Sequence, residues 1–251
     1  MAFPQVGDTA TSGERNSTTS HTVDLPTTVN SGETLIVFFC TQDDTGTTFP
    51  TGWTEFIDEN RGMGWNCAWR LAGSSEGGTT ITVTTANARR SATISMAISG
   101  AADPTSSPPT ATHAQGTSNY PNPPSHTPTA GADDYLWIAC FGRLGDMSVN
   151  GWPTNYVDNR EEYDGEEESV AISTLELNDT DDNPAFFTTN NSNAWIASTI
   201  TITPGAAGTN TQINIADSWK EIAAMQINIA DSWKEIASAK MNIGDAWKDI
   251  F

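Results

Sequence analysis

STTSHTVDLPTTVNSGETLIVFFC, residues 17–40, and YPNPPSHTPTAGADDYLWIACF, residues 120–141, share one plan. Each carries a Ser-His-Thr triplet, then a turn-rich segment, and then a continuous apolar run, LIVFFC or LWIAC. An apolar run of this length, bounded by turn residues, is typical of a strand that is buried on both faces. The recurrence predicts that the chain uses the same strand plan twice.

Two further pairs of segments follow in the same order. FPTGWTEFIDE (49–59) resembles VNGWPTNYVDN (149–159), and TVTTANARRSATISMAISG (82–100) resembles FTTNNSNAWIASTITITPG (187–205). These pairs define pseudo-repeats at about 16–100 and 120–204. We expect buried strands at 35–39 and 136–139. Apolar and polar residues alternate at 80–84, 93–99 and 196–203, which indicates half-buried strands.

A half of this size is marginal as a separate β-domain. We therefore predict an all-β fold, in which residues 1–204 form one jelly-roll-like β-sandwich built from two related halves. Two small sandwiches side by side are the alternative. The segment 101–126 joins the halves and holds six prolines. Proline removes a ladder donor, so this segment should cover or cross the sandwich without forming a central strand.

The charge of the chain is strongly negative and unevenly distributed. The net charge is −20 over 251 residues. The four lysines all lie beyond residue 211, so seven arginines face 25 acidic residues upstream. Such an acidic surface repels phosphate, so we expect no nucleic-acid partner and no membrane partner. The first residues show no signal peptide and no apolar stretch is long enough to span a bilayer, so we expect synthesis in the cytoplasm of the producing cell.

Few residues suggest a metal or cofactor site. Cys40, Cys67 and Cys140 have no metal-ligand spacing, and we expect buried free thiols. The acidic run 161–168 and the segment NDTDDN (178–183) could attract a hard cation. The weak candidate ligands are Asp179, Asp181 and Asp182. Neither segment completes an EF-hand pattern, so solvated acidic turns are favoured, and we expect no metal and no cofactor.

No catalytic motif is visible. The chain has three histidines and no GxSxG turn, so we predict that it is not an enzyme. His21 and His126 occupy matching Ser-His-Thr triplets and should be structural duplicates. Trp53 and Trp152 also match. Exposed tryptophans can stack on sugars, which makes this pair a possible glycan-binding site, but a position at the rim of the core is favoured.

A second, clearer repeat ends the chain after a linker at 205–211. Residues 212–251 hold three 14-residue units, such as INIADSWKEIAAMQ (213–226), with tryptophan at 219, 233 and 247. INI alternates like a strand, and the third unit has Gly-Asp where a hairpin turn would fall, so short β-hairpin repeats are predicted. The alternative is a short helix capped by Asp217, which would be marginal alone.

One such unit cannot bury its own apolar residues, so we expect them to pack against neighbouring units or other subunits. The predicted assembly contact consists of Ile213, Ile215, Trp219, Ile222, Ile227, Ile229, Trp233, Ile236, Ile243, Trp247 and Ile250. A homo-oligomer is therefore expected, and a trimer is one arrangement that would satisfy it.

QINIADSWKEIAAMQINIADSWKEI followed by MNIGDAWKDI resembles the INIGDAWK-type repeats that end many tailed-phage and prophage virion proteins. Upstream, SGETLIVFF, PTGWTEF and ADDYLWIA are similar to a module of phage tail and fibre-type proteins. The first two units have Ala216 and Ala230 where the family often has glycine. The resemblance implies a non-enzymatic virion surface protein, a tail or head fibre or a capsid decoration, with capsid or tail proteins as partners. The alternative function is a carbohydrate-binding module that recognises host surface glycans.

Overall fold

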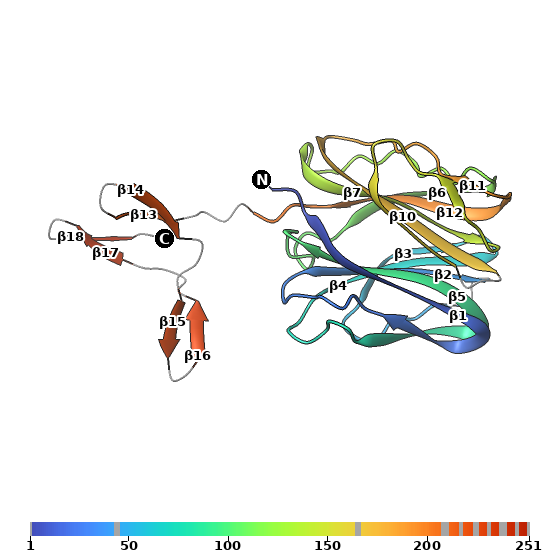
Figure 1. Cartoon of the computed structure of the whole chain (residues 1–251), viewed down its shortest axis with the longest axis horizontal. Helices are drawn as coiled ribbons and strands as arrows, with labels where there is room; N and C mark the ends of the chain where they lie inside the picture. Colours follow the sequence, from blue (N-terminus) through green and yellow to red (C-terminus); the bar gives the residue numbers. More distant parts are fainter. Residues whose placement is uncertain are drawn as a thin grey trace. The chain divides into compact units, whose positions relative to one another are not determined.

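The computed structural model describes residues 2–42, 46–163 and 167–206, and after these the backbone of six short strands between residues 211 and 249. In these parts every regular element is a strand, which confirms the all-β prediction. No helix long and apolar enough to cross a membrane occurs in the described residues. The chain divides into two compact units, Met1–Gly205 and Ala206–Phe251 (Figure 1).

Two five-stranded antiparallel sheets form the first unit. In spatial order the first sheet holds β1 (Gln5–Asp24), β5 (Thr80–Ser99), β2 (Thr34–Gln42), β4 (Met63–Leu71) and β3 (Thr54–Asn60). The second sheet holds β6 (Thr110–Ser118), β12 (Asn193–Ile202), β7 (Asp133–Leu144), β10 (Glu168–Asp179) and β9 (Val157–Tyr163). The two sheets lie face to face as layers (Figure 1).

The two sheets repeat one topology. Each first strand lies at an edge beside the last strand of its half, and the second strand of each half (β2 or β7) is central. This confirms a single sandwich built from two related halves. The path differs from a jelly roll, because the chain finishes one whole sheet before it enters the other, whereas a jelly roll alternates between sheets.

The strands expected from the sequence fall where predicted, and the two sheets contain six further strands, β1, β3, β4, β6, β9 and β10. Residues 35–39 lie in β2 and 136–139 in β7, while 80–84 and 93–99 are parts of the single long strand β5. The predicted strand 196–203 corresponds to β12. The proline-rich segment 101–126 does contain a strand, β6, but this strand is at the edge of its sheet, where proline-bounded segments are tolerated.

The inner faces of the two sheets meet in one apolar core. The inward positions of the central strands are Ile36, Phe38, Cys40, Leu136, Ile138 and Cys140. Cys40 and Cys140 are 100 positions apart, so the duplication places equivalent side chains on opposite walls of the core. Burial of these apolar groups is the main favourable contribution to the stability of the sandwich.

Trp65 links the two sheets at the centre of this core. Its ring is fully buried and stacks on Phe38, with centroids 6.3 Å apart. Its Nε1–H donates a hydrogen bond of 3.0 Å to Ser198 Oγ on the opposite sheet. The ring lies against Gly142, where an added Cβ would collide with it. Glycine is therefore required on β7 for the sheets to close over Trp65.

All three cysteines are buried thiols, as predicted, and none forms a disulfide. Burial raises the pKa of the Cys67 and Cys140 thiols well above the ordinary value. A thiol that does not ionise is a poor nucleophile and a poor metal ligand. These residues therefore act as small apolar core residues.

The outer face of each sheet also carries an apolar cluster. On the first sheet Leu35, Val37 and Phe39 pack beneath the segments around Val23 and Phe49. On the second sheet the equivalent cluster is formed by Tyr135, Trp137, Ala139, Phe141 and the loop residue Phe187. Because both faces of the central strands are covered, their sequences are continuously apolar, as in other doubly buried strands.

Three antiparallel hairpins make up the described part of the second unit. They are β13 (Thr211–Ile215) with β14 (Ser218–Ile222), β15 (Gln226–Ile229) with β16 (Ser232–Glu235), and β17 (Lys240–Ile243) with β18 (Ala246–Asp249). The hairpin prediction is therefore confirmed. The alternative helix is excluded over Ser218–Ile222, which is a strand.

Candidate functional site

The three C-terminal hairpins repeat one register. The pairs of residues directly opposite each other are Asn214–Trp219, Asn228–Trp233 and Asn242–Trp247. The next pairs are Ile213–Lys220, Ile227–Lys234 and Met241–Lys248. Directly opposed positions belong to the same face of a two-stranded sheet, and successive positions alternate between faces. The tryptophan positions therefore belong to one face of each hairpin and the Ile213-type positions to the other.

Most of the predicted assembly residues lie on these strands. Ile236 and Ile250 lie outside the described residues. The others, Ile213, Ile215, Trp219, Ile222, Ile227, Ile229, Trp233, Ile243 and Trp247, have strand positions. The alternation shows that a single apolar stripe is too simple a description, because tryptophan and isoleucine positions fall on opposite faces of each hairpin.

The matched tryptophans of the sandwich are half-buried on its outer faces. Trp53 packs on the outer cluster of the first sheet and tilts against Phe49, with centroids 6.4 Å apart. Trp152 packs on the outer cluster of the second sheet and meets Phe187 edge to face at 5.7 Å. Both therefore have the core-rim position that the sequence favours.

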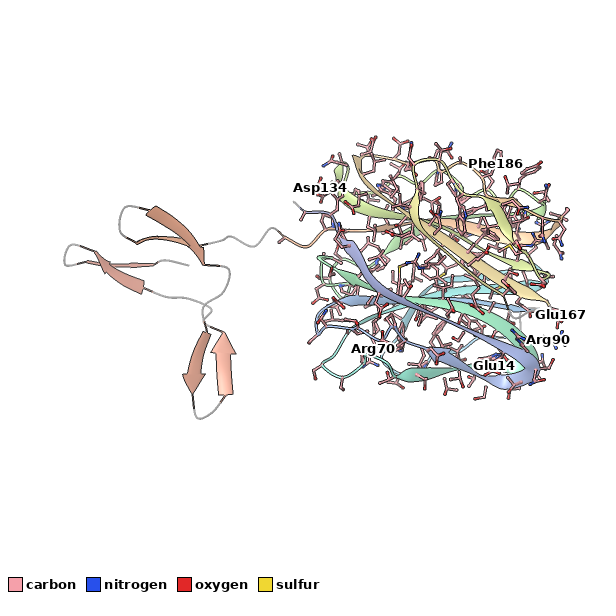
Figure 2. The ribbon with its side chains drawn as sticks, in the orientation of Figure 1. Glu14, Arg70, Arg90, Asp134, Glu167 and Phe186 are labelled. Atoms are coloured by element: carbon pink, nitrogen blue, oxygen red, sulfur yellow. The ribbon has the colours of Figure 1, made fainter. Side chains whose placement is uncertain are left out.

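Sequence reasoning missed the two aromatic residues that are most exposed among those whose burial the structure describes. Tyr120 is 49% exposed and Phe186 is 51% exposed, and their rings touch with centroids 5.2 Å apart. Phe186 lies on the outer surface of the second layer (Figure 2). The available signal was their setting in the turn-rich segments NYPNPP and NPAFF, which is typical of surface loops.

Arg143 was also missed, and it ties the loops of the second sheet to its centre. The side chain is fully buried on β7. Its Nη1 donates to Thr189 Oγ1 at 2.6 Å and to the Asn191 carbonyl at 3.1 Å, and its Nη2 donates to Asn191 Oδ1 at 2.6 Å. Burial lowers the pKa of its guanidinium group. Thr189 in turn donates its N–H to the Asn119 carbonyl at 2.9 Å, so this network reaches the segment that carries Tyr120.

The acidic candidates have structural contacts. Asp182 Oδ2 accepts a 2.5 Å hydrogen bond from Tyr156 Oη, and its backbone pairs with His126. Asp179 and Asp181 both accept hydrogen bonds from Thr180. Within the described ranges no group of three His, Cys, Asp or Glu side chains is arranged to hold a metal ion. Glu168, at the end of the run expected to be a solvated turn, is instead fully buried on β10, and that part of the prediction is wrong.

The two matching histidines are buried on the outer faces of the sheets. His21 Nδ1 is 2.9 Å from Ser91 Oγ and its Nε2 is 3.0 Å from Thr85 Oγ1, and its ring meets Phe39 edge to face. His126 meets Trp137, which is the position on the second sheet equivalent to Val37. Desolvation lowers the pKa of His21 to about 4 and also lowers that of His126. Both are neutral structural residues near neutral pH.

These histidines should make the sandwich sensitive to acid. Because the folded pKa of His21 is about 4 and its ordinary value is 6.5, only the unfolded state takes up a proton between these pH values. Stability should be complete above pH 6.5, fall as the pH drops towards 4, and change no further from this group below that. The loss attributable to His21 should be at most about 3 kcal/mol.

The measurement is urea unfolding of residues 1–205 at a series of pH values. The variant His21→Gln should show a shallower dependence between pH 4 and 6.5, and adding His126→Gln should flatten it further. An unchanged slope in both variants would contradict the assignment.

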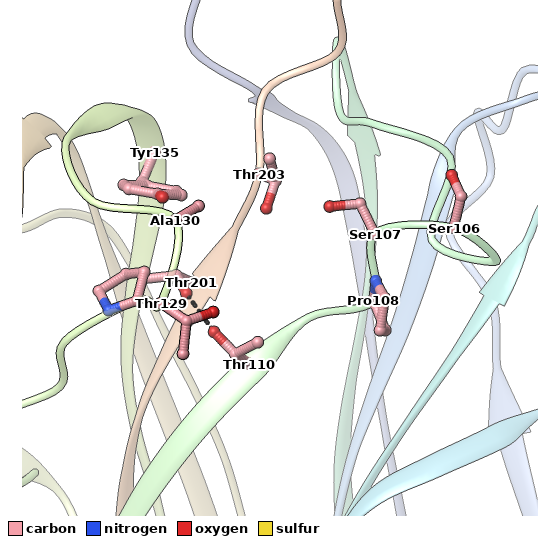
Figure 3. Close-up of a pocket in the computed structure, with 10 residues that line it drawn as sticks. Ser106, Ser107, Pro108, Thr110, Thr129, Ala130, Tyr135, Thr201 and Thr203 are labelled. Atoms are coloured by element: carbon pink, nitrogen blue, oxygen red, sulfur yellow. Dashed lines mark hydrogen bonds between the residues drawn. The ribbon is translucent and has the colours of Figure 1, made fainter.

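A small polar recess opens where β6 begins and β12 ends (Figure 3). Its volume is about 210 Å³. The hydroxyl groups around it belong to Ser106, Ser107, Thr110, Thr129, Tyr135, Thr201 and Thr203. Thr110 Oγ1 lies 2.8 Å from Thr201 Oγ1 and 3.0 Å from His126 Nε2.

A nucleophilic triad consists of a hydroxyl, an imidazole and a carboxylate, and the first two lie side by side here. The third member is missing here, because His126 Nδ1 is buried without a hydrogen-bond partner among the described residues. In the described part of the chain, no carboxylate orients the ring or stabilises its protonated form as in a triad.

No known protein family, curated protein or solved structure matches the chain. The function must therefore be argued from the hairpin register and from the surface of the sandwich.

Proposed function

We propose that this chain is a non-enzymatic structural protein of a phage particle surface, of the fibre or capsid-decoration type. The sandwich is the displayed part, and the C-terminal hairpins join copies of the chain to one another and to capsid or tail proteins. The observation that carries this proposal is the identical register of the three hairpins. The resemblance of the repeats to those of phage virion proteins supports the proposal that the chain is part of a phage particle.

A single hairpin of this kind is not expected to be stable by itself. Each described sheet of the second unit has two strands, and an isolated two-stranded hairpin is at best marginally stable in water. Open strand edges invite pairing with other chains. Each hairpin also has tryptophan positions on one face and isoleucine or methionine positions on the other. Contact on both faces is therefore needed, and a second copy of the same repeat offers a matching surface.

Charge supports association between copies. The four lysines of the chain are Lys220, Lys234, Lys240 and Lys248, all in the second unit, while the sandwich has a large acidic excess. Lysines beside an apolar contact can pair with acidic groups of a neighbouring chain. Such pairs fix the register of an interface more than they add affinity.

The test is sedimentation of the full chain. We expect an oligomer at micromolar concentration. Replacing Trp219, Trp233 and Trp247 by serine, one at a time and then together, should weaken it in steps. Loss of one central interface aromatic typically costs about 2 kcal/mol, so each step should raise the dissociation constant roughly 30-fold.

The matched control is Tyr163→Ser, which removes an exposed aromatic residue from the sandwich. This variant should sediment like the parent chain. A full chain that is monomeric at micromolar concentration, or a triple variant that assembles normally, would exclude the proposed role of the hairpins.

A further inference from the structure

Exposed large apolar side chains are unevenly divided between the two halves of the sandwich. Among the described residues four are exposed, Tyr120, Val157, Tyr163 and Phe186, and all belong to the second half. Tyr120 and Phe186 touch each other edge to face, at an interplanar angle of 74°. Because the two halves share one strand order, the shared fold does not by itself impose this difference.

Hydrogen bonds hold the two backbone segments that carry the rings. Ser118 Oγ accepts hydrogen bonds from Trp195 Nε1 and from the Tyr120 backbone N–H, both at 3.1 Å. The Phe187 N–H donates to the Pro121 carbonyl at 2.8 Å, which joins the two segments that carry the rings. Rings that are already positioned lose little conformational entropy when a ligand arrives.

The patch is small. The other exposed apolar residues, Val157 and Tyr163, are on β9, at the opposite edge of the second sheet from β6. A stable protein interface buries about 800 Å² on each partner, and two half-exposed rings provide much less apolar surface than such an interface needs. The size therefore favours a ligand of one or two rings over a protein partner.

Amide residues lie close to both rings along the chain. Asn119 and Asn122 flank Tyr120 along the chain, and Asn183 precedes Phe186 by three residues. Aromatic surface with a few amide groups suits a sugar, whose C–H face packs on a ring while its hydroxyls bond to amides.

The negative charge of the sandwich surface favours some classes of sugar over others. Asp181 and Asp182 lie in the segment that leads to Phe186, and acidic residues greatly outnumber arginines in the sandwich. Like charges across a contact disfavour binding by several kcal/mol. Sugars that carry carboxylate, sulfate or phosphate groups are therefore poor ligands, and uncharged sugars fit.

The rings are also far from the point where the chain leaves the sandwich. Tyr120 follows Ser118, which pairs with Asn193 at the start of β12, whereas Gly205 lies just beyond the other end of that strand. A strand rises about 3.3 Å per residue, so the two ends of β12 are roughly 30 Å apart. The aromatic pair and the point where the chain leaves the sandwich are at opposite ends of the sheet.

We propose that Tyr120 and Phe186 form a binding platform for uncharged glycans, on which a sugar ring stacks. The platform stands on the sandwich alone and goes beyond the assembly role of the hairpins. It also differs from a site at Trp53 and Trp152, which are half-buried in the outer clusters.

The test is affinity electrophoresis of the full chain in native gels that contain dextran, mannan, galactan or β-glucan, with alginate as the anionic comparison. We expect at least one of the four uncharged polysaccharides to retard the protein, and alginate not to do so. Tyr120→Ala and Phe186→Ala should each weaken the retardation at least tenfold. Phe186→Tyr, which keeps the ring, should retain it.

Tyr163→Ala is the matched control, an exposed aromatic residue outside the pair, and should leave retardation unchanged. The melting temperature of every variant should stay close to that of the parent, since the substituted rings are at the surface. Retardation by none of the four uncharged polysaccharides, or equal loss in the Tyr163 variant, overturns the proposal. A change of oligomer mass in the Tyr120 and Phe186 variants would assign the pair to a contact between copies, and would overturn it as well.

Discussion

Chains that end at Gly205 are expected to be folded monomers that no longer join copies of themselves or enter particles. The sandwich Met1–Gly205 is a compact unit with its own inner core and two outer clusters. The described hairpin strands pair only within their own hairpins. Removing Ala206–Phe251 therefore takes nothing from the sheets of the sandwich, while it removes every repeat.

Sedimentation and thermal unfolding of the truncated and full chains check this expectation. The truncated chain should sediment as a monomer at every concentration, and its free energy of unfolding should be positive and independent of concentration. In the full chain the apparent stability should rise with concentration, because association favours the folded state. A truncated chain that still oligomerises, or that is found in particles at the normal level, would refute the assignment of assembly to the hairpins.

Replacing Arg143 by methionine is expected to lower the free energy of unfolding by about 2–3 kcal/mol. Methionine would still fill the space of the apolar part of the side chain, but four acceptors would lose a donor: Thr189 Oγ1, the Asn191 carbonyl, Asn191 Oδ1 and the Leu144 carbonyl. Leaving a buried acceptor unsatisfied costs more than the bond itself contributes, which applies to Thr189, whereas water can reach the exposed Asn191. The loop 189–191 should also separate from the sheet, which would loosen Asn119 and the segment that follows it.

Arg160 provides the matched control for Arg143. It is exposed, and its Nε donates to Thr9 Oγ1 at 3.2 Å. Arg160→Met should change stability by about 0.5 kcal/mol or less, as expected for an exposed position. Urea unfolding of both variants in the truncated chain gives the comparison. A loss below about 1 kcal/mol for Arg143→Met would mean that the hydrogen-bond network is not the main support of this loop.

The strand plan could be predicted from the sequence because its signal is local. The apolar run around Phe38 and its counterpart around Ile138 are short and bounded by turn residues, which favours strands, and their repetition implied two similar sheets. The three hairpins were predictable for the same reason. The path of the chain between the sheets could not be predicted. The same set of strands is compatible with a chain that alternates between the sheets and with one that completes each sheet in turn.

The surface features depend on contacts between distant segments, and the sequence does not display them. Trp152 and Tyr120 are both aromatic residues in turn-rich segments, yet Phe187 covers part of the first while the second stays exposed. Arg143 ends an apolar strand and looks like a solvent-facing residue. It is buried because Asn191, 48 residues later, supplies its acceptors.

The completion of one sheet before the other has a consequence during synthesis. When Ser99 has left the ribosome, every strand of the first sheet exists, but Ile36, Phe38 and Trp65 have no opposing layer. Translation adds about 5–20 residues per second, so the 100 or so residues up to Ile202 take roughly 5–20 s. For that time the nascent chain presents a bare apolar sheet face, and a second nascent chain at the same stage presents an equivalent one. The apolar sheet faces of nascent chains on neighbouring ribosomes of one mRNA can therefore pack against each other. The spacing between ribosomes determines how often this happens before a chain's own second half has been synthesised.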